Sequence, residues 1–253
     1  MPSITEIELK KQISANDFAH LYFLYGEEKY LIRHYTSLII KKAVDPAFAD
    51  FNLHVYDAKN IDFDEVSQAA EALPMMSERT LIVIKDLASD NLNAEMSGGF
   101  LKLISDIPDT TVILISNSSV DVNMKSAKGK KILAKIDEYG CSVAFEHAGL
   151  NQLIKLVEKG AQSRNCTISP SDARYLLNLI GDDMTVIINE LDKICAYKKD
   201  GEIHREHIDA VVVKNVQARV FDLAKALTAG NCDLAMDILD TLVSMKEEPV
   251  NIL

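Results

Sequence analysis

Between residues 20 and 146 the sequence alternates regularly between strand-like and helical patterns. Five short runs rich in β-branched and aromatic residues stand at 20–26, 51–58, 80–85, 110–117 and 141–147. The middle runs, TLIVIK and TTVILISN among them, are almost uninterrupted in apolar residues, as strands covered on both faces should be. The pattern predicts a parallel sheet built from βα units.

Helical periods separate these runs at about 27–44, 62–73, 92–106 and 125–139. In the second of these segments Phe63, Val66, Ala70 and Leu73 recur at helical spacing. We expect these four side chains to form one apolar face that packs on the sheet.

The strand pattern ends near residue 147, and the rest of the chain predicts helices separated by Gly, Pro and Asp. One group covers 148–213, with a helix opening at Ser169 and Pro170. A second group begins at 214, where Gly230 is the predicted C-cap of one helix and an antiparallel helix follows. Because an apolar segment begins again at the final VNIL, we expect the sequence to stop inside a third, all-helical domain. The predicted class is α/β followed by all-α, with domains at 1–147, 148–213 and 214–253.

Composition limits the classes of partner. The formal net charge is −11 over 253 residues, so the chain as a whole repels phosphate and direct DNA binding by it alone is disfavoured. One basic run would approach nucleic acid, and its lysines are Lys125, Lys128, Lys130 and Lys131. The N-terminus has no apolar signal region, and no apolar run nears the roughly 18 residues of a membrane span. A soluble, cytoplasmic protein without a membrane partner is expected.

Metal and nucleophile signatures are absent from the sequence pattern. The four cysteines lie tens of residues apart with no CxxC, which predicts thiols rather than a metal site or a disulfide framework. His204 and His207 are three apart but have no third ligand nearby, so structural or exposed histidines are expected. No GxSxG or similar context supports a nucleophilic enzyme.

The turn after the first strand occupies the place of a phosphate loop but lacks its chemistry. A phosphate loop needs GxxxxGK[ST], whereas here Gly26 is followed by Glu27 and Glu28, whose carboxylates would repel a triphosphate. The simpler interpretation is a tight strand-to-helix turn in which the two glutamates favour the helix N-terminus. ATP hydrolysis by this chain is not expected.

Two adjacent methionines, Met75 and Met76, admit two interpretations. They pack internally at a helix end, or they lie exposed because Pro74 breaks the helix and Ser77, Glu78 and Arg79 follow at once. The second interpretation describes an adaptable apolar anchor, since methionine is unbranched and polarisable.

Four segments together resemble the delta subunit family of the bacterial DNA polymerase III clamp loader. They are YFLYGEEKYLI, EALPMMSERTLIVIKD, GDDMTVIINELDKICAY with Asn189, Glu190, Leu191 and Lys193, and the stretch from 221 to 253. The resemblance implies an AAA+-like domain with a degenerate phosphate loop at Gly26, Glu27 and Glu28, a small helical lid-like domain, and the start of a helical collar domain.

The same resemblance implies a function. Members of this family bind the beta sliding clamp and open one ring interface so that the clamp can be loaded on primed DNA during replication. The implied clamp-binding residues are Pro74, Met75, Met76 and Ser77, where relatives commonly have Phe at one or both methionine positions. Implied partners are the gamma/tau ATPase and delta prime subunits, through the collar domain, with DNA met only in the assembled complex. The resemblance implies no cofactor and no catalysis by this chain, although the family works within DNA-directed DNA polymerase complexes.

Two other classes compete with this hypothesis. An active ATPase of the same fold requires a phosphate site that the Gly26 turn does not supply, and titration with ATP discriminates it. A degenerate AAA+-like scaffold with another partner would fold but bind no sliding clamp.

Overall fold

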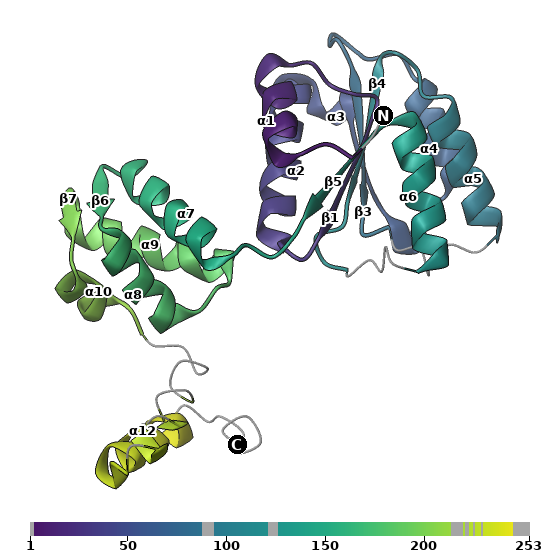
Figure 1. Ribbon diagram of the computed structural model, residues 1–253. Helices are drawn as coiled ribbons and strands as arrows, with labels where there is room; N and C mark the ends of the chain where they lie inside the picture. Colours follow the sequence, from purple (N-terminus) through teal and green to yellow (C-terminus); the bar gives the residue numbers. More distant parts are fainter. Residues whose placement is uncertain are drawn as a thin grey trace. The chain divides into compact units, whose positions relative to one another are not determined.

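The computed structural model describes residues 3–87, 94–120, 126–213, 220, 223–224, 226–228 and 230–244. The chain divides into two compact units, Met1–His147 and Ala148–Leu253 (Figure 1). The separation of a third domain at residue 214 stays a prediction.

In the described part of the first unit, five parallel strands form one sheet. They are β1 (Leu21–Gly26), β2 (Leu53–Asp57), β3 (Thr80–Lys85), β4 (Thr111–Ser116) and β5 (Cys141–Phe145). Their order is β2-β3-β4-β1-β5, so β1 lies between β4 and β5. The parallel α/β sheet predicted from the sequence is confirmed, and β3 and β4 are buried almost throughout because both of their faces are covered.

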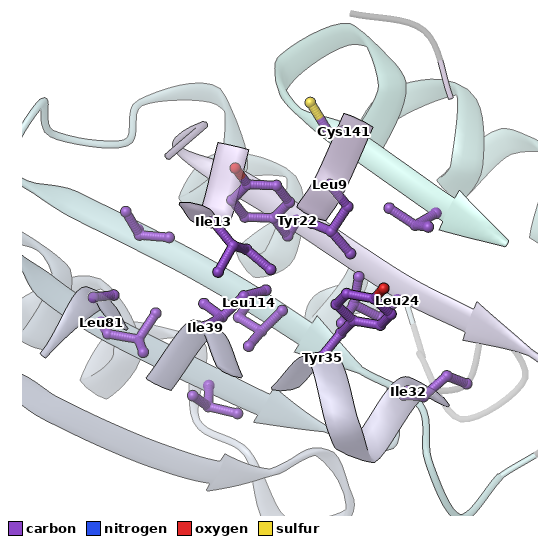
Figure 2. Packing of buried hydrophobic residues seen from close by; sticks show 14 of the residues in the cluster. Leu9, Ile13, Tyr22, Leu24, Ile32, Tyr35, Ile39, Leu81, Leu114 and Cys141 are labelled. Carbon is purple, nitrogen blue, oxygen red and sulfur yellow. The ribbon is translucent and has the colours of Figure 1, made fainter. Parts of the chain in front are cut away.

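Helices cover the two faces of this sheet (Figure 1). On one face lie α1 (Glu6–Ala15) and α2 (Lys29–Ala43), and on the other lie α4 (Phe63–Glu71), α5 (Ala94–Ser105) and α6 (Ala127–Tyr139). Figure 2 shows the core on the first face, where side chains of α1 and α2 pack over those of the strands; the labelled residues are Leu9, Ile13, Ile32, Tyr35, Ile39, Tyr22, Leu24, Leu81, Leu114 and Cys141. The short elements are η1 (Pro46–Phe48), α3 (Ala49–Asn52) and η2 (Ala58–Asn60).

The predicted position of Leu73 on the buried face of the second helix is wrong. Helix α4 ends at Glu71, its C-cap residue Ala72 is extended, and Leu73 is 85% exposed. The physical reason is Pro74, which disfavours helical backbone at the residue before it. The hydroxyl of Thr111 donates to the carbonyl of Ala70 at 2.7 Å and so satisfies one of the carbonyls left open at the end of α4.

The second unit is mainly helical, and its described helices are α7 (Leu150–Gln162), α8 (Pro170–Ile180), α9 (Met184–Lys198), α10 (Arg205–Val211) and α12 (Cys232–Ser244). The expectation that strands end near residue 147 is wrong in one detail. Two three-residue strands, β6 (Cys166–Ile168) and β7 (Gly201–Ile203), pair in parallel beside these helices. Gly230 has a φ of 71°, the left-handed conformation that a C-cap glycine adopts.

Candidate functional site

A single turn in the first unit exposes three large apolar side chains within four residues. This turn, residues 73–79, joins α4 to β3 and is called the Met turn below. Leu73 is 85% exposed, Met75 52% and Met76 78%. Internal packing of the methionine pair is therefore wrong, and the predicted exposure is confirmed. A concentrated apolar surface of this kind is typical of a protein-binding site.

One end of the Met turn is held by Asn52, the last residue of α3. The backbone N–H of Met75 donates to Asn52 Oδ1 at 2.7 Å. Asn52 Nδ2 donates in return to the Met75 carbonyl at 2.8 Å and also to the Phe48 carbonyl at 3.1 Å. Asn52 has no exposed surface, so these bonds are shielded from water.

The other end is held by Arg79, immediately before β3. Its guanidinium lies over the ring of Phe18 at 4.9 Å from the centroid, and it donates to the Asn16 carbonyl at 3.4 Å and to the Glu78 carboxylate at 3.0 Å. Phe18 packs edge-on against Tyr22 of β1. The Tyr22 hydroxyl accepts from the Ala19 N–H at 2.9 Å and donates to Gln12 at 2.7 Å, and burial raises its pKa to about 12. The Met turn is thus fastened to the core at Met75 and at Arg79, on the two sides of Met76.

Within the turn, Met76 has a φ of 51°, in the left-handed region that few non-glycine residues adopt. Pro74 and Ser77, on either side of the methionines, are partly buried. Met75 and Met76 therefore extend from a backbone that their neighbours hold in place.

The turn at Gly26 is closed by the neighbouring strand. Gly26 has a φ of 131°, and a Cβ built there would lie 2.2 Å from the Phe145 carbonyl oxygen, so only glycine fits. The N–H groups of Glu27 and Glu28 both donate to this same oxygen, at 2.8 and 3.1 Å. The amides that a phosphate loop would offer to a nucleotide are therefore occupied within the fold.

The two glutamates differ in their surroundings. Glu28 is buried, and its Oε1 lies 3.1 Å from His147 Nδ1. Glu27 is exposed. Glu28 stands at the N-cap position of α2, but its side chain makes no capping hydrogen bond. The turn is instead bonded to β5 through the Phe145 carbonyl, so it does not present an open anion site.

Titration of the chain with Mg-ATP should accordingly give no saturable heat. The reason is that two amide donors already bind Phe145, and the turn carries two carboxylates where a phosphate loop would carry glycine and lysine. Isothermal titration calorimetry, with AMP as a matched nucleotide, measures this directly. Saturable binding of ATP would contradict the assignment of a closed loop.

The predicted DNA-proximal lysines fall partly outside the described residues. Lys125 lies outside them, and so does the side chain of Lys128, whereas Lys130 and Lys131 are exposed on α6. Helix α6 leads into the parallel strand β5, so its first residues lie at the carboxyl edge of the sheet, where the Gly26 turn also lies. The Met turn leads into the start of β3 and lies at the opposite edge.

The other sequence-predicted features are the cysteines, the pair of His204 and His207, and the ion pair of Lys193 with Glu190. All four cysteines are thiols, and burial, with Cys166 nearby, raises the pKa of Cys195 to about 12. The backbone N–H of His204 donates to His207 Nδ1 at 3.1 Å, and the predicted pair of Lys193 with Glu190 is confirmed at 2.6 Å.

Among the residues that the structure describes, no group of His, Cys, Asp or Glu is suited to hold a metal ion. Over the same ranges, no helix has the length and apolar character to cross a membrane.

Comparisons with known proteins agree with this architecture. Residues 22–143 match the family model "DNA polymerase III, delta subunit", and residues 149–210 match a "middle domain" model. The DNA polymerase III subunit delta of Bacillus subtilis (strain 168) is 23% identical over 251 residues, covering 96% of this chain and 71% of the relative.

Solved structures show the same fold. The Bacillus subtilis DNA clamp loader delta protein (YqeN) matches with a TM-score of 0.70 and 21% identity, over 97% of this chain and 74% of that one. A RuvB protein of Thermotoga maritima matches with a TM-score of 0.50 and 12% identity, over 92% of this chain and 78% of that one. The fold is thus AAA+-like, a parallel α/β sheet domain followed by helices. Over residues 22–143 the chain matches the DNA polymerase III delta subunit family, and it resembles the clamp loader delta fold over most of its length.

Proposed function

We propose that this chain is the clamp-loader subunit that binds the beta sliding clamp through the Met turn and opens one interface of the ring. Opening would let the clamp be loaded on primed DNA during replication. The observation that carries the proposal is the Met turn itself, an exposed apolar surface whose backbone is held at Met75 and Arg79, in a chain whose residues 22–143 match the delta subunit family.

The Met turn acts as the anchor of a larger interface. Burying each of its exposed apolar side chains is worth roughly 1.5–3 kcal/mol. After the costs of ordering two proteins, two such side chains alone would support only about millimolar to micromolar association. Tight binding therefore requires further contacts from the surface around the methionines. Leu73, two residues before Met75, is the nearest exposed apolar side chain in the Met turn that could supply one.

Opening the ring requires no covalent chemistry from this chain. A subunit that binds an open or strained clamp interface more tightly than a closed one shifts the ring toward opening by that difference in affinity. Because the Gly26 turn is closed, the energy of ATP enters through partner subunits. We propose that the gamma/tau ATPase and delta prime subunits associate through a collar domain that begins at residue 214.

The collar proposal is supported by exposed apolar side chains in this region. Leu227, Met236 and Val243 are exposed on helices whose buried residues form a small cluster of their own. Co-purification of the full chain with the ATPase subunits, lost when these three side chains become polar, is the measurement that decides it.

The direct test of the proposed function is surface plasmon resonance of the chain over an immobilised sliding clamp from the same organism. Saturable binding is expected. A folded chain that binds no clamp would favour a scaffold role with another partner.

Contact with DNA is proposed only within the assembled complex, through the basic run at Lys125, Lys128, Lys130 and Lys131. The variant Lys130→Glu with Lys131→Glu should weaken DNA binding by the complex. It should also lower the slope of log K against log salt by up to about 2, since each phosphate contact contributes about 0.7–0.9. DNA affinity measured over a salt series checks this, with Lys10→Glu plus Lys11→Glu in α1 as the matched exposed pair. An unchanged slope would remove the basic run from the DNA contacts.

A further inference from the structure

Asn52 is a polar side chain with no exposed surface, and its amide serves a segment 23 residues further along the chain. It lies at the end of the four-residue helix α3, just before the edge strand β2. Its bond to the Phe48 carbonyl is local, whereas its other two bonds go to Met75. Burying an amide costs free energy unless its N–H and C=O groups are hydrogen-bonded, and here two of the three hydrogen bonds are made with the backbone of the Met turn.

The two bonds to Met75 form a reciprocal pair. The side-chain amide accepts from the Met75 N–H at 2.7 Å and donates to the Met75 carbonyl at 2.8 Å, as a neighbouring strand would do. This pairing fixes both peptide planes that flank the Met75 Cα. The pairing requires a donor and an acceptor side by side at the end of a side chain of this length. Aspartate and leucine are similar in size, but aspartate lacks the donor and leucine lacks both groups.

The conformation that follows needs such a constraint. Met76 has a φ of 51° and its side chain is mostly exposed, so its own packing does little to hold it. Left-handed backbone at a non-glycine residue persists where the surrounding structure imposes it. Asn52 on one side and Arg79 on the other are the described contacts that do so.

We infer that Asn52 is a positioning residue for partner binding, which holds the Met turn in its binding conformation before the partner arrives. This inference rests on the proposed function, because the partner is the sliding clamp. Ordering the turn within the free chain removes that cost from the binding step, so the two methionines bind as a preformed anchor. Asn52 itself is buried and makes no contact with the clamp.

A double-mutant cycle tests the inference in the full chain. Asn52→Ala should weaken clamp binding about tenfold when Met75 and Met76 are present, the size expected when one or two side chains must be ordered on binding. In the background that carries both Met75→Ala and Met76→Ala, the same change should weaken binding less than about twofold, because both positioned side chains are already gone. Asn52→Asp keeps the volume and the acceptor but loses the donor, and it carries the same cycle if Asn52→Ala does not fold.

The matched control is Asn117→Ala. Asn117 is also an asparagine without exposed surface, and it donates to the Leu87 carbonyl at 2.9 Å, away from the Met turn. This variant should lower stability without changing clamp affinity. An equal loss of affinity with and without the two methionine side chains would overturn the inference, because it would mean that Asn52 acts only through the fold.

Hydrogen exchange gives a readout that needs no clamp. The Met75 amide should be protected in the unmodified chain and should exchange at least about tenfold faster in Asn52→Ala, with β3 amides unchanged. Unchanged protection at Met75 would overturn the positioning role. If the unmodified chain binds no clamp but the exchange result holds, the proposed function fails while the role of Asn52 in shaping the turn stands.

Discussion

Replacement of both Met75 and Met76 by alanine should weaken binding to the sliding clamp by about 2 kcal/mol or more, roughly 30-fold. The two side chains are 52% and 78% exposed in the free chain, so their truncation removes little that the fold uses. In the complex they are the apolar anchors, and losses of this size are typical of such anchors. The thermal stability of the variant should stay close to that of the unmodified chain, as for other surface substitutions.

Surface plasmon resonance measures this prediction, and the change should lie mainly in the dissociation rate. Ile7→Ala with Val213→Ala is a matched control, since the two side chains are 74% and 64% exposed and neither residue belongs to the Met turn. The control should bind the clamp normally. Equal affinity of the Met75/Met76 variant and the unmodified chain would remove the Met turn from the interface.

The exposure of the methionines was predictable because its cause is local. Pro74 ends the helical pattern and three polar residues follow the pair. The same proline also removes Leu73 from the helix. Helical spacing from Ala70 indicated a buried position for Leu73, but the effect of Pro74 on the backbone was stronger than this spacing. Asn52 was not predictable, since nothing in the sequence around it indicates a bond to Met75, 23 residues away.

The sheet was predictable for a similar reason, since strands buried on both faces are marked by their own apolar residues. Helix α1 was missed because only Leu9 and Ile13 are buried along it, while Thr5 and Glu8 fix its start through a capping box. The strands β6 and β7 were not predicted because a run of three residues is too short to show the alternation of apolar and polar residues that is typical of a strand. Their pairing is decided by the helices around them.

For the turn at Gly26, the sequence predicted the tight bend and the structure supplies its cause. The backbone of β5 lies so close that a side chain has no room, and Glu27 and Glu28 then donate to the same Phe145 carbonyl. A glycine in this place is therefore required by the packing of two paired strands. No ligand is needed to explain it.

Gly26→Ala should consequently lower the free energy of unfolding by about 3–5 kcal/mol, at the upper end of single substitutions. The new Cβ would meet backbone atoms of Phe145 at 2.2, 2.7 and 2.8 Å, which cannot rotate away as a flexible side chain does. The φ of 131° adds strain that L-residues rarely accept. Relief requires β1 and β5 to separate at Gly26 and Phe145, which are paired in the sheet.

Urea unfolding followed by circular dichroism measures this loss, with Gly98→Ala as the matched glycine. Gly98 lies in α5 with nothing within 4 Å of a built Cβ, so alanine there should be neutral or stabilise by up to about 1 kcal/mol. Each variant adds one methyl group, but only Gly26→Ala should lower the urea concentration at the midpoint of unfolding. If Gly26→Ala leaves the urea midpoint unchanged, β5 moves enough to make room for the added Cβ. The close packing of β5 on the turn would then no longer explain the absence of a phosphate loop.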